Sequence, residues 1–298
     1  MRCLLLEAVK ISEHKLANYN LLVILRESGK NIFSDVEQLL MIGSAEMLIE
    51  GIDPVIFTLG PLTVRWYGLM MALSFAFGVY YLIKNGKKIG YDEDLLLLLT
   101  IVVIISAIAG ARAIYVLTNW PFFAANPQDI IRIDKGGLAF HGGLLGGFLS
   151  GWLFTRRHRL SFRALLDLSV PGIAIGIMLV RIANIFNQEI LGRATLLFPF
   201  ERHPTQVYGS LIGLFLLLQH NYLARKGENP PGYLFWSFVF SYSLLRGLIE
   251  ETFRANPLYL WGYISEVWGA GFFTLTHLAT PPLLILSWLM LRKIKNSR

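Results

Sequence analysis

The sequence predicts an all-α integral membrane protein with about seven transmembrane helices. Hydrophobic residues make up 54% of the 298 residues and charged residues only 16%, whereas soluble domains are roughly one quarter charged. Apolar stretches that could cross a hydrocarbon core of about 30 Å, which takes roughly 20 residues, recur along the chain. Lysines and arginines gather in the short segments between these stretches, as topology signals do.

Seven apolar stretches are candidates for membrane-spanning helices. They lie near residues 67–85, 95–118, 141–156, 164–187, 205–223, 232–250 and 269–291. The third is short and rich in glycine, so we expect it to pack tightly against its neighbours or to be partly re-entrant. Proline, asparagine, lysine and arginine between the stretches mark helix ends and turns.

The distribution of basic residues predicts the orientation. Thirteen lysines and arginines lie in one set of alternating segments, near 84–88, 156–163, 225–226 and 292–298. Five lie in the other set, within 119–140, 188–204 and 251–268. The positive-inside rule places the first set and the C-terminus in the cytoplasm, and the start of the first helix outside.

The first 46 residues do not fit this topology. They are fairly polar, carry several basic residues and show no signal-peptide layout. We expect residues 1–46 to reflect a start codon placed too early, with Met41 or Met47 as the real beginning, rather than a genuine extension. Residues 47–298 are expected to form a single polytopic membrane domain.

Composition argues against several other classes of protein. The one cysteine, Cys3, excludes a disulfide framework and a cysteine-rich metal site. Six histidines without an HExxH pair give a zinc hydrolase little support. The net charge of +7 could suggest nucleic acid, but its placement in short loops indicates topology instead, so we expect no nucleic-acid partner.

Polar residues follow the fourth apolar stretch in the segment RIANIFNQEILGR. Helical spacing would place Arg181, Asn184 and Gln188 on one stripe, with Asn187 and Glu189 beside it. Charged groups in apolar helices usually face a protein interior or a water-filled cavity, so this stripe suggests a lined cavity. An ordinary helix end with snorkelling arginines is the alternative.

A second cluster lies at the end of the sixth stretch. Arg246, Glu250 and Arg254 are spaced at i, i+4 and i+8, which predicts an Arg–Glu–Arg ladder on one helix face. Two arginines sharing one glutamate leave a net positive charge, and a phosphate suits the planar guanidinium group. The alternative is a structural ion pair.

Isolated residues near helix ends are weaker candidates. His141 opens the glycine-rich third stretch, where small neighbours leave its ring room to reach a ligand, although a lone histidine is more often structural. Helix capping would suffice to explain His203, and an aromatic belt would explain Tyr67. Arg112 lies near the outer end of the second helix. The simplest common partner of these helix ends is an anionic lipid head group of the outer leaflet.

Five motifs occur in order between residues 50 and 291. They are DPVIF…WYGLM from Asp53 to Met70, GARAIYVL from Gly110 to Leu117, HGGLLG from His141 to Gly146, the segment with Arg181, Asn184, Asn187, Glu189, Gly192 and Arg193, and HPTQVYG with His203, Pro204, Gln206 and Tyr208. In order and spacing the chain resembles the bacterial prolipoprotein diacylglyceryl transferases.

The chain departs from the family pattern at several positions. Val180 and Ala183 stand where the signature has glycines. Gly209 stands where the family's HPSQLYE motif has its glutamate, and FRANP at 253–257 replaces FREPD. The core arginines stay in place.

The resemblance implies a reaction and a set of roles. A diacylglyceryl group would pass from phosphatidylglycerol to the lipobox cysteine of a preprolipoprotein, forming a thioether and releasing glycerol phosphate, without a metal or soluble cofactor. Arg181 and Arg246 would hold the phosphate, and His141 would be the base for the thiol, with Tyr67 as its rival. The remaining substrate-binding candidates are Asn184, Asn187, Glu189, Gly192, Glu250, Arg254, Arg112 and His203.

The same resemblance implies a multi-pass protein of the bacterial cytoplasmic (inner) membrane. A membrane anion or lipid transporter using the same arginines is an alternative, as is a catalytically silent paralogue. Transporter folds often contain inverted repeats, and we find no convincing repeat in this sequence.

Overall fold

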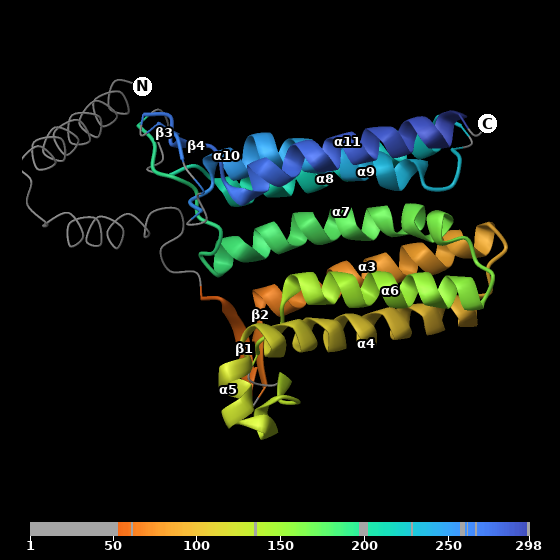
Figure 1. Ribbon diagram of the computed structural model, residues 1–298, viewed down its shortest axis with the longest axis horizontal. Helices are drawn as coiled ribbons and strands as arrows, with labels where there is room; N and C mark the ends of the chain where they lie inside the picture. Colours follow the sequence, from red (N-terminus) through yellow and green to blue (C-terminus); the bar gives the residue numbers. More distant parts are fainter. Residues whose placement is uncertain are drawn as a thin grey trace, which may run out of the picture. The chain divides into compact units, whose positions relative to one another are not determined.

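The computed structural model describes residues 53–60, 62–133, 136–196, 202–227, 229–256, 260, 262–265 and 267–296. The expected later start of the protein, at Met41 or Met47, concerns residues that lie outside this described part of the chain. Element labels follow Figure 1.

Each of the seven predicted stretches contains a helix. The long helices are α3 (Trp66–Lys88), α4 (Glu93–Thr118), α6 (Phe140–Arg157), α7 (Phe162–Phe186), α8 (Thr205–Arg225), α9 (Tyr233–Leu245) and α11 (Leu275–Asn296). Among the described helices, α3, α4, α7 and α8 are long and apolar enough to cross a membrane. The chain is thus a mainly helical membrane protein.

Short elements complete the fold. They are the 6-residue helix α5 (Trp120–Ala125), the 3-10 turn η1 (Pro127–Asp129), the π-helical turn η3 (Arg246–Glu250), the short helix α10 (Glu251–Phe253) and four strands. Strand β1 (Val55–Leu59) pairs antiparallel with β2 (Leu62–Arg65), and β3 (Ile264–Ser265) pairs with β4 (Ala270–Gly271). The fold is therefore not purely helical. Because Ala270 and Gly271 pair as a strand, the last long helix begins at Leu275 and not near 269.

The described residues form two compact units. The first takes its described residues from positions 53–72, 176–216 and 239–288. The second takes them from Leu73–Ile175, Leu217–Phe238 and Leu289–Arg298. The expectation of one domain over residues 47–298 stays a prediction.

Close packing of α4 against α6 organises the second unit (Figure 1). A Cβ atom on Gly142 would lie 2.3 Å from the carbonyl oxygen of Gly110, and one on Gly146 would lie 2.3 Å from that of Ser106. Only glycine allows backbones to approach so closely. The GARAIYVL and HGGLLG motifs therefore meet at one helix contact, as the glycine-rich sequence indicates. Farther along, Leu96, Leu99, Phe154 and Leu165 form an apolar core.

Helix starts in this unit are capped by carboxylates. Asp92 accepts a hydrogen bond from the backbone N–H of Leu95 at the start of α4. Asp167 of α7 is buried and accepts hydrogen bonds from the backbone N–H groups of Gly232 (2.6 Å) and Phe235 (2.7 Å) at the start of α9. These caps satisfy N–H groups that the helices leave without intrahelical partners.

Candidate active site

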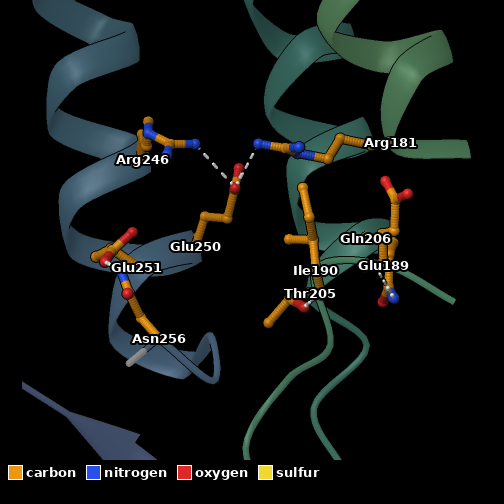
Figure 2. A network of polar contacts seen from close by, with 9 residues as sticks. All are labelled: Arg181, Glu189, Ile190, Thr205, Gln206, Arg246, Glu250, Glu251 and Asn256. Carbon is orange, nitrogen blue, oxygen red and sulfur yellow. Dashed lines mark hydrogen bonds and ion pairs between the residues drawn. The ribbon is translucent and has the colours of Figure 1, made fainter. Parts of the chain in front are cut away.

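A buried carboxylate between two arginines forms the centre of the first unit. Arg181 Nη2 lies 2.6 Å from Glu250 Oε1, and Arg246 Nη1 lies 2.9 Å from the same oxygen. The Glu250 side chain is 1% exposed and that of Arg181 is 11% exposed. Figure 2 shows Glu250 reaching between the two guanidinium groups, one from each side. A carboxylate this buried is tolerated because both neighbours are cations that donate hydrogen bonds.

The two arginines come from different helices. Arg181 lies in the last part of α7, and Arg246 and Glu250 open and close the π-helical turn η3. Turns of this type widen the helix locally and are frequent at functional sites. The predicted pairing of Arg246 with Glu250 at i, i+4 is confirmed.

The predicted third rung of the ladder is wrong. The last helical stretch of this segment, α10, ends at Phe253, and Arg254 has extended backbone and forms a β-bridge with Gly192. Arg254 therefore does not continue the helix face that carries Arg246 and Glu250. The second arginine on Glu250 is Arg181, which comes from a distant part of the chain.

Asn184 extends the cluster along α7. With its amide oriented to match both neighbours, it accepts a hydrogen bond from Arg181 Nη1 and donates one to Glu189 Oε2, each at 3.2 Å. Polar contacts thus run from Glu189 through Asn184 and Arg181 to Glu250. Gln188 does not share this stripe, because α7 ends at Phe186 and Gln188 has a positive φ of 53°.

The segment after α7 is fixed by backbone hydrogen bonds to two other segments. The N–H of Arg193 donates to the Phe253 carbonyl at 2.8 Å, and the N–H of His203 donates to the Arg193 carbonyl at 2.9 Å. Gly192 lies beside these backbone contacts, and a Cβ atom on it would be 2.0 Å from the His203 carbonyl oxygen. Close backbone approach explains why glycine stands at position 192, and its predicted contact with substrate stays a prediction.

His203 is buried and has partners on both ring nitrogens. Nε2 lies 2.8 Å from the Trp268 carbonyl oxygen and Nδ1 lies 3.1 Å from the Tyr208 hydroxyl. A carbonyl can only accept, so Nε2 carries the proton in this arrangement. The side chain ties the start of α8 to the loop at Trp268 rather than capping α8. Its predicted contact with substrate stays a prediction.

Sequence reasoning gave no contacts for the residues of α8 and α9 that hold this cluster. Thr205 and Gln206 are buried and donate to the carbonyls of Ile190 (2.6 Å) and Glu189 (2.8 Å). Tyr242 hydrogen-bonds to Arg246. The spacing of Tyr242, one helical turn before Arg246, could have indicated this contact.

Buried charges of both signs surround Glu250, because the neighbouring Glu251 is also fully buried. Burial lowers the pKa of the Arg254 guanidinium and the nearby charge of Arg246 lowers it further, while Glu251 and Glu250 oppose this shift. Within the described part of the chain, the buried Nε atoms of Arg181 and Arg254 have no hydrogen-bond acceptor, and the buried oxygens Asn187 Oδ1, Glu250 Oε2 and Glu251 Oε2 have no donor. The two guanidinium N–H donors without acceptors suit an oxyanion.

Tyr67 lies at the start of α3, in the same unit as Arg181. Its neighbour Trp66 stacks on Phe186 at the end of α7, with ring centroids 4.8 Å apart and planes 16° apart. This stacking joins the beginning of α3 to the helix that carries Arg181. The Tyr67 hydroxyl has no hydrogen bond to any residue that the structure describes.

Arg112 and His141 belong to the second unit, whereas Arg181, Arg246 and Glu250 belong to the first. Arg112 is 9% exposed and donates to the backbone carbonyls of Asp129, Ile130, Gly136 and Gly137, at 2.5 to 3.0 Å. These contacts fix the segment that leads into α6. His141, in the first turn of α6, is exposed and contacts the ring of Phe140.

No metal centre is formed by the residues that the structure describes. Among them, no group of three or more His, Cys, Asp or Glu side chains could hold a metal ion. The polar cluster offers guanidinium and amide groups instead, which bind oxyanions directly.

The fold and the cluster define a polytopic membrane protein with a buried polar site built around arginines of two helical segments. A model of the prolipoprotein diacylglyceryl transferase family matches residues 54–291. The chain belongs to this family.

Curated relatives carry the corresponding name. The chain is 49% identical over 251 residues to the phosphatidylglycerol–prolipoprotein diacylglyceryl transferase of Thermoanaerobacter sp. (strain X514), covering 84% of this chain and 97% of the relative. The enzyme of that name from Thermus thermophilus is 36% identical over 79% of this chain and 96% of its own length. The enzyme of that name from Bacillus velezensis is 34% identical over 230 residues, which cover 70% of this chain and 83% of the relative.

Proposed function

We propose that this protein transfers the diacylglyceryl group of phosphatidylglycerol to the lipobox cysteine of a preprolipoprotein. Membership in the family and relatives named for this reaction support the activity. The observation that carries the site is the convergence of Arg181 and Arg246 on one oxygen of Glu250. The transporter alternative and the silent paralogue are not favoured by these relatives.

The chemistry requires stabilisation of a leaving phosphate. The cysteine sulfur attacks the glyceryl carbon next to the phosphate, a C–S bond forms, and the C–O bond breaks with its electrons going to the phosphate oxygen. The thiol proton leaves to a base. Phosphatidylglycerol carries one negative charge on its phosphodiester, and the departing glycerol phosphate becomes a monoester with a second negative charge.

The two arginines that converge on Glu250 match this change in charge. The guanidinium groups of Arg181 and Arg246 would attract the phosphodiester and would interact more strongly with the more negative leaving group. Interactions that strengthen towards the transition state accelerate the reaction. In this proposal Glu250 orients both guanidinium groups, and Asn184 and Asn187 hydrogen-bond to the glycerol part or to phosphate oxygens.

The remaining roles concern the thiol and the edges of the site. The thiolate is the nucleophile, and an unperturbed cysteine has a pKa of about 8.5, so a base or a positive field assists at neutral pH. His141 is our candidate for the base and Tyr67 its rival. Glu189 positions Arg181 through Asn184. Arg254, Gly192 and His203 support the segment that carries Asn187 and Glu189.

The membrane topology is part of the proposal. Seven crossings, at α3, α4, α6, α7, α8, α9–α10 and α11, would place the C-terminus in the cytoplasm of a bacterial inner membrane. Fusing a reporter that is active only outside the cytoplasm to the C-terminus and to the loop after α4 tests this arrangement. Activity in the loop fusion alone is expected, and the reverse pattern would contradict the orientation.

The activity itself is tested with purified protein, phosphatidylglycerol and a synthetic lipobox peptide. Mass spectrometry should show a peptide heavier by one diacylglyceryl group, and no gain when serine replaces the cysteine. An unmodified cysteine peptide, in an assay where a relative from this family is active, would contradict the proposed function.

A further inference from the structure

Gly209 of α8 lies directly against the side chain of Arg181. A Cβ atom built on Gly209 would lie 2.7 Å from both Cγ and Nε of Arg181 and 2.8 Å from Cδ. Favourable separations between such atoms are about 3.5 to 4.0 Å. The missing side chain of Gly209 therefore provides the space through which Arg181 runs.

The helices cannot easily move apart at this point. Ser210, the next residue of α8, donates a hydrogen bond from its hydroxyl to the Met178 carbonyl of α7 at 3.0 Å. This bond ties the two backbones together within one helical turn of Arg181. A side chain at position 209 would thus displace the Arg181 stem rather than the helix.

The far end of Arg181 has little freedom to adapt. Its Nη2 is held 2.6 Å from Glu250, and its Nη1 faces Asn184 at 3.2 Å. Displacing Cγ and Cδ by the distance that a methyl group needs would move the guanidinium away from both partners. The geometry of the charged end depends on the empty space beside the stem.

We propose that Gly209 is a positioning residue that holds the Arg181 guanidinium in the orientation needed to bind the phosphate. The family motif has a glutamate at this position, whereas within the part of this chain that the structure describes, Glu250 is the one carboxylate paired with Arg181. The inference rests on the proposed phosphate-binding role of Arg181.

The first test compares Gly209→Ala with Gly147→Ala in the transfer assay. Gly147 is the matched control, because a Cβ atom there would find ordinary contacts of 3.6 Å with Ala107 and Val103. We expect Gly209→Ala to raise KM for phosphatidylglycerol about 10-fold or more without changing KM for the peptide, and Gly147→Ala to change neither. An unchanged KM for phosphatidylglycerol in Gly209→Ala would overturn the inference.

The second test separates positioning from packing. Phosphatidylglycerol should raise the unfolding temperature of the wild type in phosphatidylcholine micelles, because it binds the folded state. Gly209→Ala and Arg181→Ala should each lose part of this increase, and the double variant should lose no more than Arg181→Ala alone. Additive losses would show that Gly209 acts independently of Arg181 and would overturn the inference.

Two further outcomes, a Gly209→Ala variant that does not fold and an inactive wild type, can also be interpreted. If Gly209→Ala does not fold, the double variant with Arg181→Ala decides, because removing the arginine stem removes the clash: recovery of folding supports the inference, and failure contradicts it. If the wild type shows neither transfer nor stabilisation by phosphatidylglycerol, the proposed function fails, which a defect confined to Gly209→Ala would not imply.

Discussion

Arg181 and Glu250 are 69 residues apart in the chain, and Arg181 Nη2 lies 2.6 Å from Glu250 Oε1. Glu250 is completely buried and receives Arg246 on the same oxygen. This one carboxylate therefore joins α7 to η3 and fixes the direction of two guanidinium groups.

Replacing Glu250 with glutamine should destabilise the protein. Two buried arginines would then face each other without a carboxylate, and removing one partner of a buried pair costs about 3 kcal/mol or more. Thermal unfolding in detergent measures the loss. The matched control is Glu93→Gln, because the Lys87–Glu93 pair is about half exposed and such pairs contribute about 1 kcal/mol or less. Equal, small shifts for both variants would contradict the structural importance of Glu250.

Replacing His141 with glutamine should slow transfer in a way that depends on pH. If His141 accepts the thiol proton, its loss should lower kcat about 100-fold or more near pH 7. The loss should shrink as pH rises past about 8.5, because the thiol then ionises without help. Rates from neutral to alkaline pH, with Tyr67→Phe in parallel, make the test. A wild-type rate in His141→Gln would dismiss the base role, and a pH-dependent loss in Tyr67→Phe would transfer that role to Tyr67.

Replacing Arg112 with glutamine should loosen the segment between α4 and α6. Four backbone carbonyls accept hydrogen bonds from Arg112, and a shorter amide leaves some of them unpaired, at a cost of about 2 kcal/mol. Faster cleavage between residues 119 and 139 by a protease is the expected readout. Arg132→Gln, at a half-exposed side chain in the same segment, should leave the rate unchanged. Similar cleavage of both variants would argue against this role of Arg112.

Replacing Gly192 with alanine should disturb the close approach of the backbone at Gly192 to that at His203, which supports the segment with Asn187 and Glu189. The added Cβ would lie 2.0 Å from the His203 carbonyl oxygen, so backbone must move, at a cost of about 3 kcal/mol. The unfolding temperature should fall together with activity. Gly151→Ala, whose Cβ would have contacts of 3.6 and 3.7 Å, is the control that should behave as wild type. A fully stable Gly192→Ala protein would contradict the close approach.

The helices and the local ion pair could be predicted from sequence because their causes are local. Apolar stretches of sufficient length define α3, α4, α7 and α8, and i, i+4 spacing brings Arg246 to Glu250. The same reasoning failed for Arg254 and Gln188, since it assumed that each helix continues. Both residues lie just beyond a helix end, where periodicity no longer applies.

The pairing of Arg181 with Glu250 could not be predicted from spacing, because it depends on how α7 packs beside η3. The strands β3 and β4 were missed for a related reason: each is 2 residues long and forms only through its partner. Motif resemblance drew attention to Gln206 and Tyr208 without indicating their contacts. The space that Gly209 leaves for Arg181 also became visible only from the packed helices.

The most direct test of the central claim is the rate of diacylglyceryl transfer to a lipobox peptide by Arg246→Ala, with Arg246→Lys beside it. Arg181 still pairs with Glu250 in these variants, so the buried carboxylate keeps a cation. We predict that Arg246→Ala lowers kcat/KM for phosphatidylglycerol about 100- to 1,000-fold and that lysine, which keeps the charge but not the planar fork, restores part of it. Transfer at the wild-type rate by a folded Arg246→Ala protein would contradict the assignment of this cluster as the phosphate site.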